Sequence, residues 1–437
     1  MKLWVRDWLD PFVWAVLAGL LIAAPSPARG EPDTSRIDWG LDLALVNSSG
    51  HPSWLEGSAG KLRYDPAHDG GVVSRGFIDY ERLLGSTVTA HVISEIYCDG
   101  HGSTVDLTEA YLDWRPMTAT ATRFRVKSGV FYPRVSLENV GPGWSSPYTI
   151  SSSAINTWVG EELRAVGAEL TVSHRLQSLG NLHTVSLHAA LFGGNDPAGG
   201  LMAWKGWSIH DRQSRLNDEI PLPPVPRIQP GDWWEDQAPF ITPLLEIDES
   251  PGYYVNLEWR YGSKLLVRAM HYDNRADPQG IENNQFAWWT YFDHLGVQAT
   301  LPGDVGLMAQ WMDGFTAWGR LTDGVYSVDN EFRSSYLLLT RKFDRHRLTV
   351  RYDDFEVSED DTTPLDENRE TGHAWTVAYR YTATEHVAIA AEWLEIRTIR
   401  PAWRYFDLSE ARTERQFQIA LQLRFGGQAR TGHTDMR

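Results

Sequence analysis

The sequence predicts an all-β protein, a transmembrane antiparallel β-barrel of about sixteen strands. Three observations predict this fold: the pattern of the last strand, the lengths of the connections and an export signal at the start. The last ordered stretch runs from Gln416 to Phe425, and its apolar residues are Phe417, Ile419, Leu421, Leu423 and Phe425. Successive side chains of a strand point to opposite faces, so one face suits lipid and the other suits water. A soluble sandwich strand can show the same alternation.

The strand pattern continues through the chain and alternates with connections of two kinds. The predicted strands span residues 37–46, 72–84, 86–98, 105–115, 122–133, 164–175, 182–193, 252–261, 263–273, 286–300, 304–318, 332–343, 346–357, 373–382, 386–398 and 414–425. Links such as Gly85-Ser86 and Asp344-Arg345 are tight, whereas 47–71 and 134–163 are long. Short periplasmic turns and long outer loops are typical of outer-membrane barrels. An even strand number also leaves both termini on the periplasmic side.

An export signal is predicted at the start of the chain. Lys2 and Arg6 precede an apolar run from Phe12 to Ala24, which is too short to span a membrane as a helix. The sequence is equally consistent with cleavage by a signal peptidase after Ala28 and after Gly30. The predicted division is a signal peptide at 1–28, a barrel at 29–425 and a periplasmic C-terminal tail at 426–437. Cys98 is the single cysteine, so stability must come from strand pairing and packing rather than from a disulfide.

Composition excludes some functions and favours others. The formal net charge of −17 argues against nucleic acid as a partner, because binding to a duplex needs clustered lysine and arginine. Twenty tryptophans and seventeen tyrosines would supply the aromatic girdles at the two interfaces of a barrel. A large aromatic-rich β-sandwich or a sugar-binding protein would use them differently.

The polar faces of the strands predict a charged lumen. Sixteen strands enclose more space than side chains fill, which leaves an aqueous channel. A charge on the lipid face costs about 2–4 kcal/mol near the midplane, so charged strand residues must point inward. The candidate pore-lining residues are Arg123, Arg125, Lys127, Glu109, Asp113, Arg347 and Arg351. These residues give the lumen charges of both signs, with an excess of positive charge. Such a row of charges can also line a hydrated wall without making the channel selective for any ion.

The third outer loop, residues 134–163, differs in composition from a solvated loop. It contains glycines and prolines that give turns, together with apolar residues that need burial: Leu137, Val140, Trp144, Tyr148, Ile155 and Trp158. The loop is therefore expected to fold into the lumen.

The sixteen strands, this loop and the aromatic final strand together resemble Gram-negative outer-membrane porins of the sixteen-stranded diffusion type. The resemblance implies that the loop narrows the channel and that Trp144 and Tyr148 belong to the constriction. It also implies that Glu138, Glu161 or Glu162 faces the wall arginines. By the same resemblance, the expected partners are membrane lipid and lipopolysaccharide, and a homotrimer is a possible assembly. No cofactor or metal is expected.

A looser similarity links the chain to phosphate- and anion-selective porins, through Arg123, Arg125 and Lys127 beside the loop. Those channels are usually richer in lysine than this chain. One departure from the porin pattern is that twelve residues follow Phe425, where such strands usually end the protein.

Enzymatic chemistry has little support. The sequence has no His-Glu-x-x-His, no Gly-x-Ser-x-Gly and no glycine-rich phosphate loop. A membrane-bound barrel enzyme of lipase type would need a serine–histidine pair, for which the neighbouring strands offer Ser173, Ser186, His174, His183 and His188. Histidines on barrel strands are more often girdle or lumen residues, so the protein is expected not to be an enzyme.

Two further loops leave alternatives open. Residues 358–372 carry six acids, which could bind calcium or bridge to lipopolysaccharide, although a solvated acidic loop is the commoner case. Residues 194–251 contain Trp204, Trp207, Trp233 and Trp234 and are longer than structureless connections usually are. This segment could be a lid, a surface for stacking sugars or a disordered loop.

The predicted function is a passive, water-filled channel for small hydrophilic solutes in the outer membrane of a Gram-negative bacterium, with a preference for anions. The alternatives are a substrate-specific channel for phosphate or sugar, the lipase-type barrel enzyme and a closed structural barrel. The sequence specifies neither the transported solute nor the oligomeric state.

Overall fold

The structure is a computed structural model that describes residues 35–98, 105–178 and 181–426. The predicted signal peptide and the second outer loop lie outside the described residues, as does all of the predicted tail except Gly426. No helix in the described ranges is both long and apolar enough to cross a membrane.

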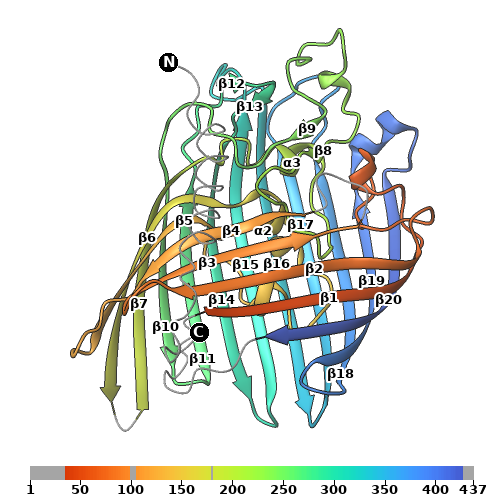
Figure 1. Cartoon of the computed structure of the whole chain (residues 1–437). Coiled ribbons are helices and arrows are strands. Elements are labelled where there is room, and N and C mark those ends of the chain that lie inside the picture. The colour runs from red at the N-terminus through yellow and green to blue at the C-terminus, as the bar shows by residue number, and fades with distance from the viewer. Residues whose placement is uncertain (1–34, 99–104, 179–180, 427–437) are drawn as a thin grey trace.

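Sixteen antiparallel strands form one closed barrel, as the alternation predicted (Figure 1). The strands are β1 (Ser35–Ser48), β2 (Gly70–Leu83), β3 (Val88–Ile96), β4 (Val105–Trp114), β5 (Thr122–Phe131), β6 (Ala165–Ser178), β7 (Asn181–Gly193), β10 (Gly252–Tyr261), β11 (Leu265–Asp273), β14 (Trp289–Leu301), β15 (Val305–Trp318), β16 (Val328–Phe343), β17 (His346–Glu359), β18 (Glu370–Thr382), β19 (Val387–Ile399) and β20 (Ala411–Gly426). Each strand pairs with its neighbour in the chain, and β1 closes the barrel against β20.

The two rims differ as expected from the connection lengths. One rim has tight turns, and in the turn between β16 and β17 Asp344 has a φ of 53°. Two-residue hairpins need a positive φ, which aspartate tolerates better than most residues.

The other rim carries the long loops, which contain the remaining elements of the described residues. These are η1 (Trp54–Glu56), η2 (Pro142–Trp144), α2 (Ala154–Glu162), α3 (Gly200–Trp204), η3 (Pro226–Ile228) and η4 (Pro401–Phe406), with the small strands β8 (Ile220–Pro221), β9 (Phe240–Ile241), β12 (Ile281–Glu282) and β13 (Gln285–Phe286).

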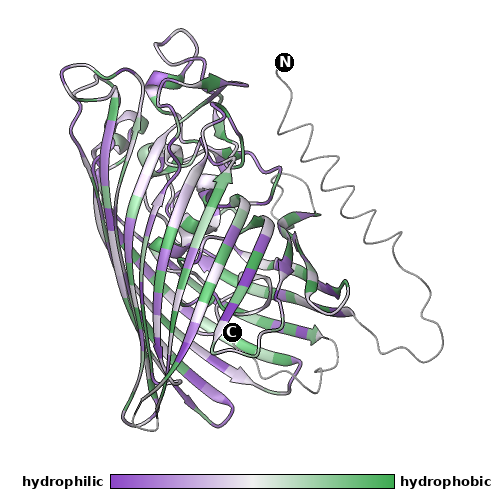
Figure 2. Cartoon of the chain, turned by 90° about the vertical axis from the view of Figure 1, so that its left-hand side faces the viewer, coloured by the Kyte–Doolittle hydropathy of each residue, from purple (hydrophilic) through white to green (hydrophobic). Residues whose placement is uncertain are grey.

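The outer surface of the barrel is an apolar band. Hydrophobic and hydrophilic residues alternate along the strands, so the two colours of Figure 2 alternate along each ribbon. Large apolar side chains at outward positions of the wall remain exposed, among them Leu191, Leu257, Leu295, Phe417 and Leu421. A closed sheet with such a face removes all strand edges and suits the hydrocarbon core of a membrane.

Aromatic rings gather at both ends of this band. Near the long-loop rim, the rings of Tyr291 and Phe315 stack with centroids 5.4 Å apart. Near the short-turn rim, Phe425 stacks on Trp39 of β1 with centroids 4.5 Å apart. The final aromatic residue of β20 therefore lies where β20 and β1 close the barrel.

The interior of the barrel is filled at the long-loop end by three loops that fold inward. We name them loop 1 (residues 49–69), loop 3 (134–163) and loop 4 (194–251). Their buried apolar side chains meet inward-facing wall residues in one core, which includes Leu62, Leu137, Ile155, Trp158, Met202, Trp207, Phe292, Phe332 and Phe355. At its centre, the Trp158 ring of α2 lies 5.1 Å from the Phe332 ring of β16.

The facing of β20 gives a direct test of the membrane assignment. Replacing Leu421, which is 38% exposed on the apolar band, with arginine should impair barrel assembly, at a cost of about 2–4 kcal/mol near the midplane. The neighbouring variant Gln422→Arg places the same charge in the lumen opposite Asp42 and should assemble normally. Heat-modifiable migration on gels measures assembly, and equal behaviour of the two variants would contradict the facing.

Candidate functional site: a lumen narrowed by inward-folded loops

Arg351 of β17 attaches loop 3 to the barrel wall. Its guanidinium donates to Asp353 Oδ2 at 2.8 Å, to Glu138 Oε2 at 3.2 Å and to the carbonyl oxygens of Ser151 and Ser152, both at 2.8 Å. The side chains of Arg351, Asp353 and Glu138 are completely buried. A buried charge is tolerated only when it is paired and hydrogen-bonded, and this network satisfies that condition.

Two inward-facing carboxylates of the wall also anchor loop 3. Glu392 of β19 accepts the backbone N–H groups of Ile150 at 2.6 Å and Ser151 at 3.0 Å. Asp353 accepts the N–H of Ala154, the first residue of α2, at 3.1 Å. Arg351, Asp353 and Glu392 of the wall therefore bind backbone groups of loop 3 that would otherwise be buried without hydrogen-bond partners.

Glu138 organises the loop from inside. Its Oε1 accepts the N–H of Ser153 at 2.7 Å and the amide of Asn156 at 2.8 Å. Ser153 is the N-cap of α2, and its hydroxyl accepts the N–H of Asn156. Glu138, Glu161 and Glu162 were the acids expected to face wall arginines, and of these Glu138 pairs with one, Arg351.

Glu161 and Glu162 instead bind loop 4. Glu161 pairs with Lys205 and with His210 Nε2, the latter at 2.8 Å. Glu162 accepts the N–H of Leu201 at 3.0 Å, and burial raises its pKa to about 7. The end of α2 therefore joins two loops rather than facing the channel.

Loop 4 folds into the lumen, which sequence reasoning left undecided. It enters at Gly199, which has a φ of 114° and whose Cβ, if present, would lie 2.0 Å from Thr316 Oγ1 of β15. Only glycine allows the loop to approach the wall this closely. The buried run Gly200–Trp204 that follows forms α3. In the sequence, the apolar residues that follow Gly199-Gly200 are the feature that indicates this inward path.

Loop 1 completes the packing. Lys61 pairs with Glu370 of β18 at 2.7 Å and donates to the carbonyl oxygen of Lys205 in loop 4 at 2.7 Å. Arg400, which follows β19, also pairs with Glu370 and donates to the carbonyl oxygen of Ala203. Loops 1 and 4 are thus tied to the same wall carboxylate.

The β5 row lies on the lumen side, but its charges are mostly compensated. Arg125 pairs with Asp113 of β4 at 2.7 Å, and Arg125 remains 24% exposed. Lys127 is buried, directly across from Glu169 of β6, with its ammonium over the Tyr111 ring. Arg123 is exposed and has no ion pair among the described residues. Glu109, on β4, is buried and accepts the N–H of Tyr132.

A second basic row crosses the opposite wall near the short-turn rim. Lys342, Arg347 and Arg380 are direct cross-strand neighbours on β16, β17 and β18. Arg347 and Arg380 are partly exposed, and Lys342 is exposed. Within the described chain none of the three has an ion-pair partner. Like charges directly opposite each other destabilise a sheet, so this row is held together by the surrounding barrel.

The aromatic residues expected in the constriction lie on two sides of loop 3. Trp144 stacks on Tyr132 with centroids 4.1 Å apart, so it packs against the wall. Tyr148 is partly exposed, and its ring lies 5.0 Å from the Arg347 guanidinium. Loop 3 therefore places an aromatic ring beside Arg347, the middle residue of the second basic row.

The structure does not bring together the serine–histidine pair of the enzyme alternative. Ser173 Oγ lies 2.8 Å from Ser186 Oγ. His174 contacts Thr122, and His188 contacts Thr171. His183 stacks near Trp259, as a girdle residue does.

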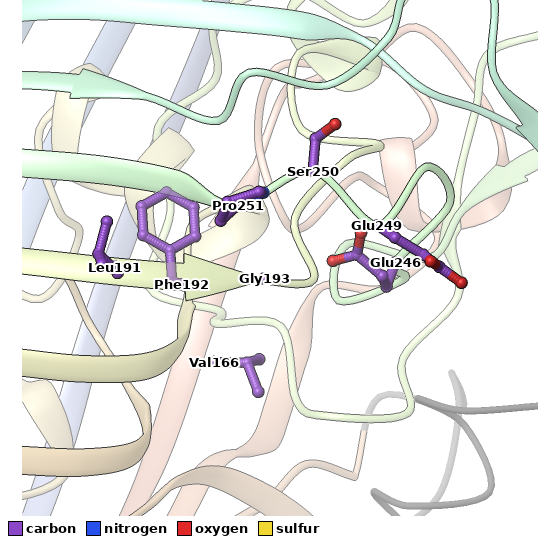
Figure 3. A pocket seen from close by; sticks show the side chains of 8 residues that line it. All are labelled: Val166, Leu191, Phe192, Gly193, Glu246, Glu249, Ser250 and Pro251. Carbon is purple, nitrogen blue, oxygen red and sulfur yellow. The ribbon is translucent and has the colours of Figure 1, made fainter.

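A cavity of about 300 Å³ lies at the long-loop rim, beside the end of β7 and the end of loop 4 (Figure 3). Leu191, Phe192 and Pro251 line one side of it, and Glu246 and Glu249 line the other.

Arg351 gives a test of the loop attachment. Arg351→Met should lower the free energy of unfolding by about 3–5 kcal/mol, because it leaves Glu138 and Asp353 buried without a counter-charge. Arg347→Met removes the same charge from a site without a carboxylate partner and should cost less than about 1 kcal/mol. Urea unfolding in lipid vesicles compares them, and similar losses would show that the buried network does not stabilise the barrel.

Known proteins resemble this chain in fold rather than in sequence. No protein-family model and no curated protein matches it. It is similar in structure to the outer membrane channel DcaP of Acinetobacter baumannii, with a TM-score of 0.50 and 10% identity over 90% of this chain and 96% of that one. An anion-selective porin from Comamonas acidovorans aligns with a TM-score of 0.47 and 11% identity over 90% and 99% of the two chains. The chain has the closed sixteen-stranded barrel fold of outer-membrane porins.

Proposed function

We propose that the protein is a passive channel of the Gram-negative outer membrane for small hydrophilic solutes. The observation that carries this proposal is the contrast between the two halves of the lumen. At the short-turn end, Arg125, Arg260 and Arg424 have side chains that are 24%, 39% and 21% exposed although they point inward. At the long-loop end, loops 1, 3 and 4 fill the barrel. A wet vestibule leading to a loop-made constriction is the arrangement of a selective pore.

Anion preference follows from which lumen charges lack a counter-charge. Arg125 is paired with Asp113, Arg424 with Asp42, and Arg260 with Glu258. Lys342, Arg347 and Arg380 have no such partner among the described residues, and neither has Arg123. Uncompensated charges in a narrow lumen with low-dielectric walls act on each passing ion. The second basic row, rather than the whole β5 row, is therefore the main source of the preference.

The net charge of −17 does not oppose this preference. Many of the acids lie in outer loops, where physiological salt screens them within about 8 Å. A specific channel for phosphate or sugar remains the alternative within the same class, and saturable block of conductance by that solute distinguishes it. The homotrimer implied by the porin resemblance is a proposal that the mass of the detergent-solubilised particle tests.

The first functional test is single-channel recording in planar bilayers. The parent should conduct, and deleting Asn139 to Ser151 should raise the conductance, because the deletion removes loop backbone that Arg351 and Glu392 hold inside the barrel. A gel assay for folded barrel serves as the control for assembly. A parent without conductance would make the protein a closed barrel, and unchanged conductance in the deletion would place the constriction elsewhere.

The second functional test is the reversal potential in a salt gradient. Arg347→Glu and Arg380→Glu should each shift selectivity toward cations, and the double variant should shift it further. Arg320→Glu makes the same charge change at an exposed position of an outer loop and should leave the potential unchanged. Parent-like potentials in both lumen variants would remove the second basic row from the selectivity mechanism.

A further inference from the structure

Three acidic residues meet where the seventh outer loop contacts the rest of the long-loop rim. Glu359 is the last residue of β17, and Asp361 and Asp366 follow it in the loop that leads to β18. One carboxylate oxygen from each lies within 4.8 Å of the other two. We name Glu359, Asp361 and Asp366 the loop-7 triad.

The triad is partly buried, because Asp366 is buried and Glu359 and Asp361 are half-buried. The side chain of Glu359 is 7% exposed, and Asp366 is 4% exposed. Glu359 Oε1 and Asp366 Oδ2 are both inaccessible to solvent and have no hydrogen-bond partner in the described chain. Each unsatisfied buried oxygen of this kind costs free energy unless a ligand satisfies it.

The neighbouring cations neutralise the triad only in part. Arg369 pairs with Glu367 at 2.6 Å and forms a longer ion pair with Glu359 at 3.8 Å, and its side chain is 60% exposed. Arg400 is committed to Glu370 and to backbone carbonyl groups of loop 4. Among the described residues, the three close carboxylates therefore have one ion pair, the long contact from Arg369 to Glu359.

Other acidic groups in the described residues are better satisfied. Asp196, near Glu246 and Asp248, accepts the N–H groups of Ile247 and Asp248. In the group of Asp79, Glu81 and His91, the histidine ring pairs with Asp79 at 2.6 Å. Within the described chain, each of these two groups has one buried atom without a hydrogen-bond partner, Glu246 Oε1 and His91 Nδ1, whereas the loop-7 triad has two such carboxylate oxygens.

We propose that the loop-7 triad binds one divalent cation and that this cation is calcium. The donor set consists of carboxylate oxygens alone, which favours a hard cation. Calcium–oxygen distances are about 2.3–2.6 Å, so two ligand atoms on one ion lie at most about 5 Å apart, which the triad satisfies. Water completes the six to eight ligands that calcium takes.

The cation would hold three outer loops together. Asp366 Oδ1 accepts the indole N–H of Trp204 in loop 4 at 3.1 Å. Asp361 Oδ2 accepts the N–H of Asp329 at the start of β16 at 2.9 Å. Thr363 donates to the carbonyl oxygen of Ser327, which precedes β16, at 2.7 Å. Neutralising the triad therefore stabilises the contact of loop 7 with the inward-folded loop 4.

Calorimetric titration of the full-length folded protein in detergent, freed of metal with a chelator, tests the proposal. Calcium chloride should bind saturably, and Asp366→Asn should weaken one class of site by about tenfold or more, because it removes a charged ligand. Asp360→Asn is the matched control: Asp360 is exposed in the same loop and lies outside the triad, so the parent affinity should persist.

Thermal unfolding of the same proteins gives a second test, which does not depend on the heat of binding. Without calcium, Asp366→Asn should melt above the parent, because it removes repulsion among three carboxylates that lie close together. With calcium, the parent should gain stability and Asp366→Asn should not. If Asp366→Asn fails to assemble, Asp361→Asn takes its place.

Two results would overturn the proposal. One is the absence of saturable calcium binding by the parent. The other is unchanged affinity in both triad variants, which would place any bound calcium elsewhere.

Discussion

The buried pairing of Arg351 with Glu138 and Asp353 is the interaction on which the interior of this barrel depends. A guanidinium without solvent access must find partners for its donors, and the backbone carbonyl groups of Ser151 and Ser152 supply two of them. That requirement fixes the path of loop 3 across the lumen and places the start of α2 against β17. The end of α2 then binds loop 4 through Glu161 and Lys205. The inner loops are therefore connected in series, with Arg351 as the first link.

The same charged residue types serve two purposes at the two ends of the lumen. At the long-loop end, wall carboxylates such as Glu370 and Glu392 are buried and hold loop backbone or loop lysine. At the short-turn end, wall arginines remain partly hydrated. The difference comes from what covers each residue, because a polar group buried under a loop must be satisfied by that loop, whereas a hydrated one is satisfied by water. The residues that attach the loops and the hydrated basic residues therefore lie on different parts of the same strands.

The sequence predicted all sixteen strands because the lipid face imposes a strict alternation, and β20 shows this most clearly. It predicted the facing of Arg351, Arg347 and Arg125, since parity determines which side of the wall a residue occupies. It did not predict that Arg351 would be buried and Arg347 partly exposed, because burial in the lumen depends on loops distant in the chain. The inward path of loop 4 was missed for the same reason: Gly199 matters only because Thr316 of β15 lies against it. The burial of Asp366 likewise depends on Trp204.

The seam between β1 and β20 has a consequence for the order of folding. Backbone atoms of Ser49 and Arg415 meet across this seam although they are 366 positions apart in the chain. No hairpin added earlier can substitute for this pairing, so every intermediate that lacks β20 exposes two unpaired strand edges. Such edges recruit other chains, and contacts of this sequence separation form slowly. Both edges therefore stay open to pairing with other chains until the last strand is available.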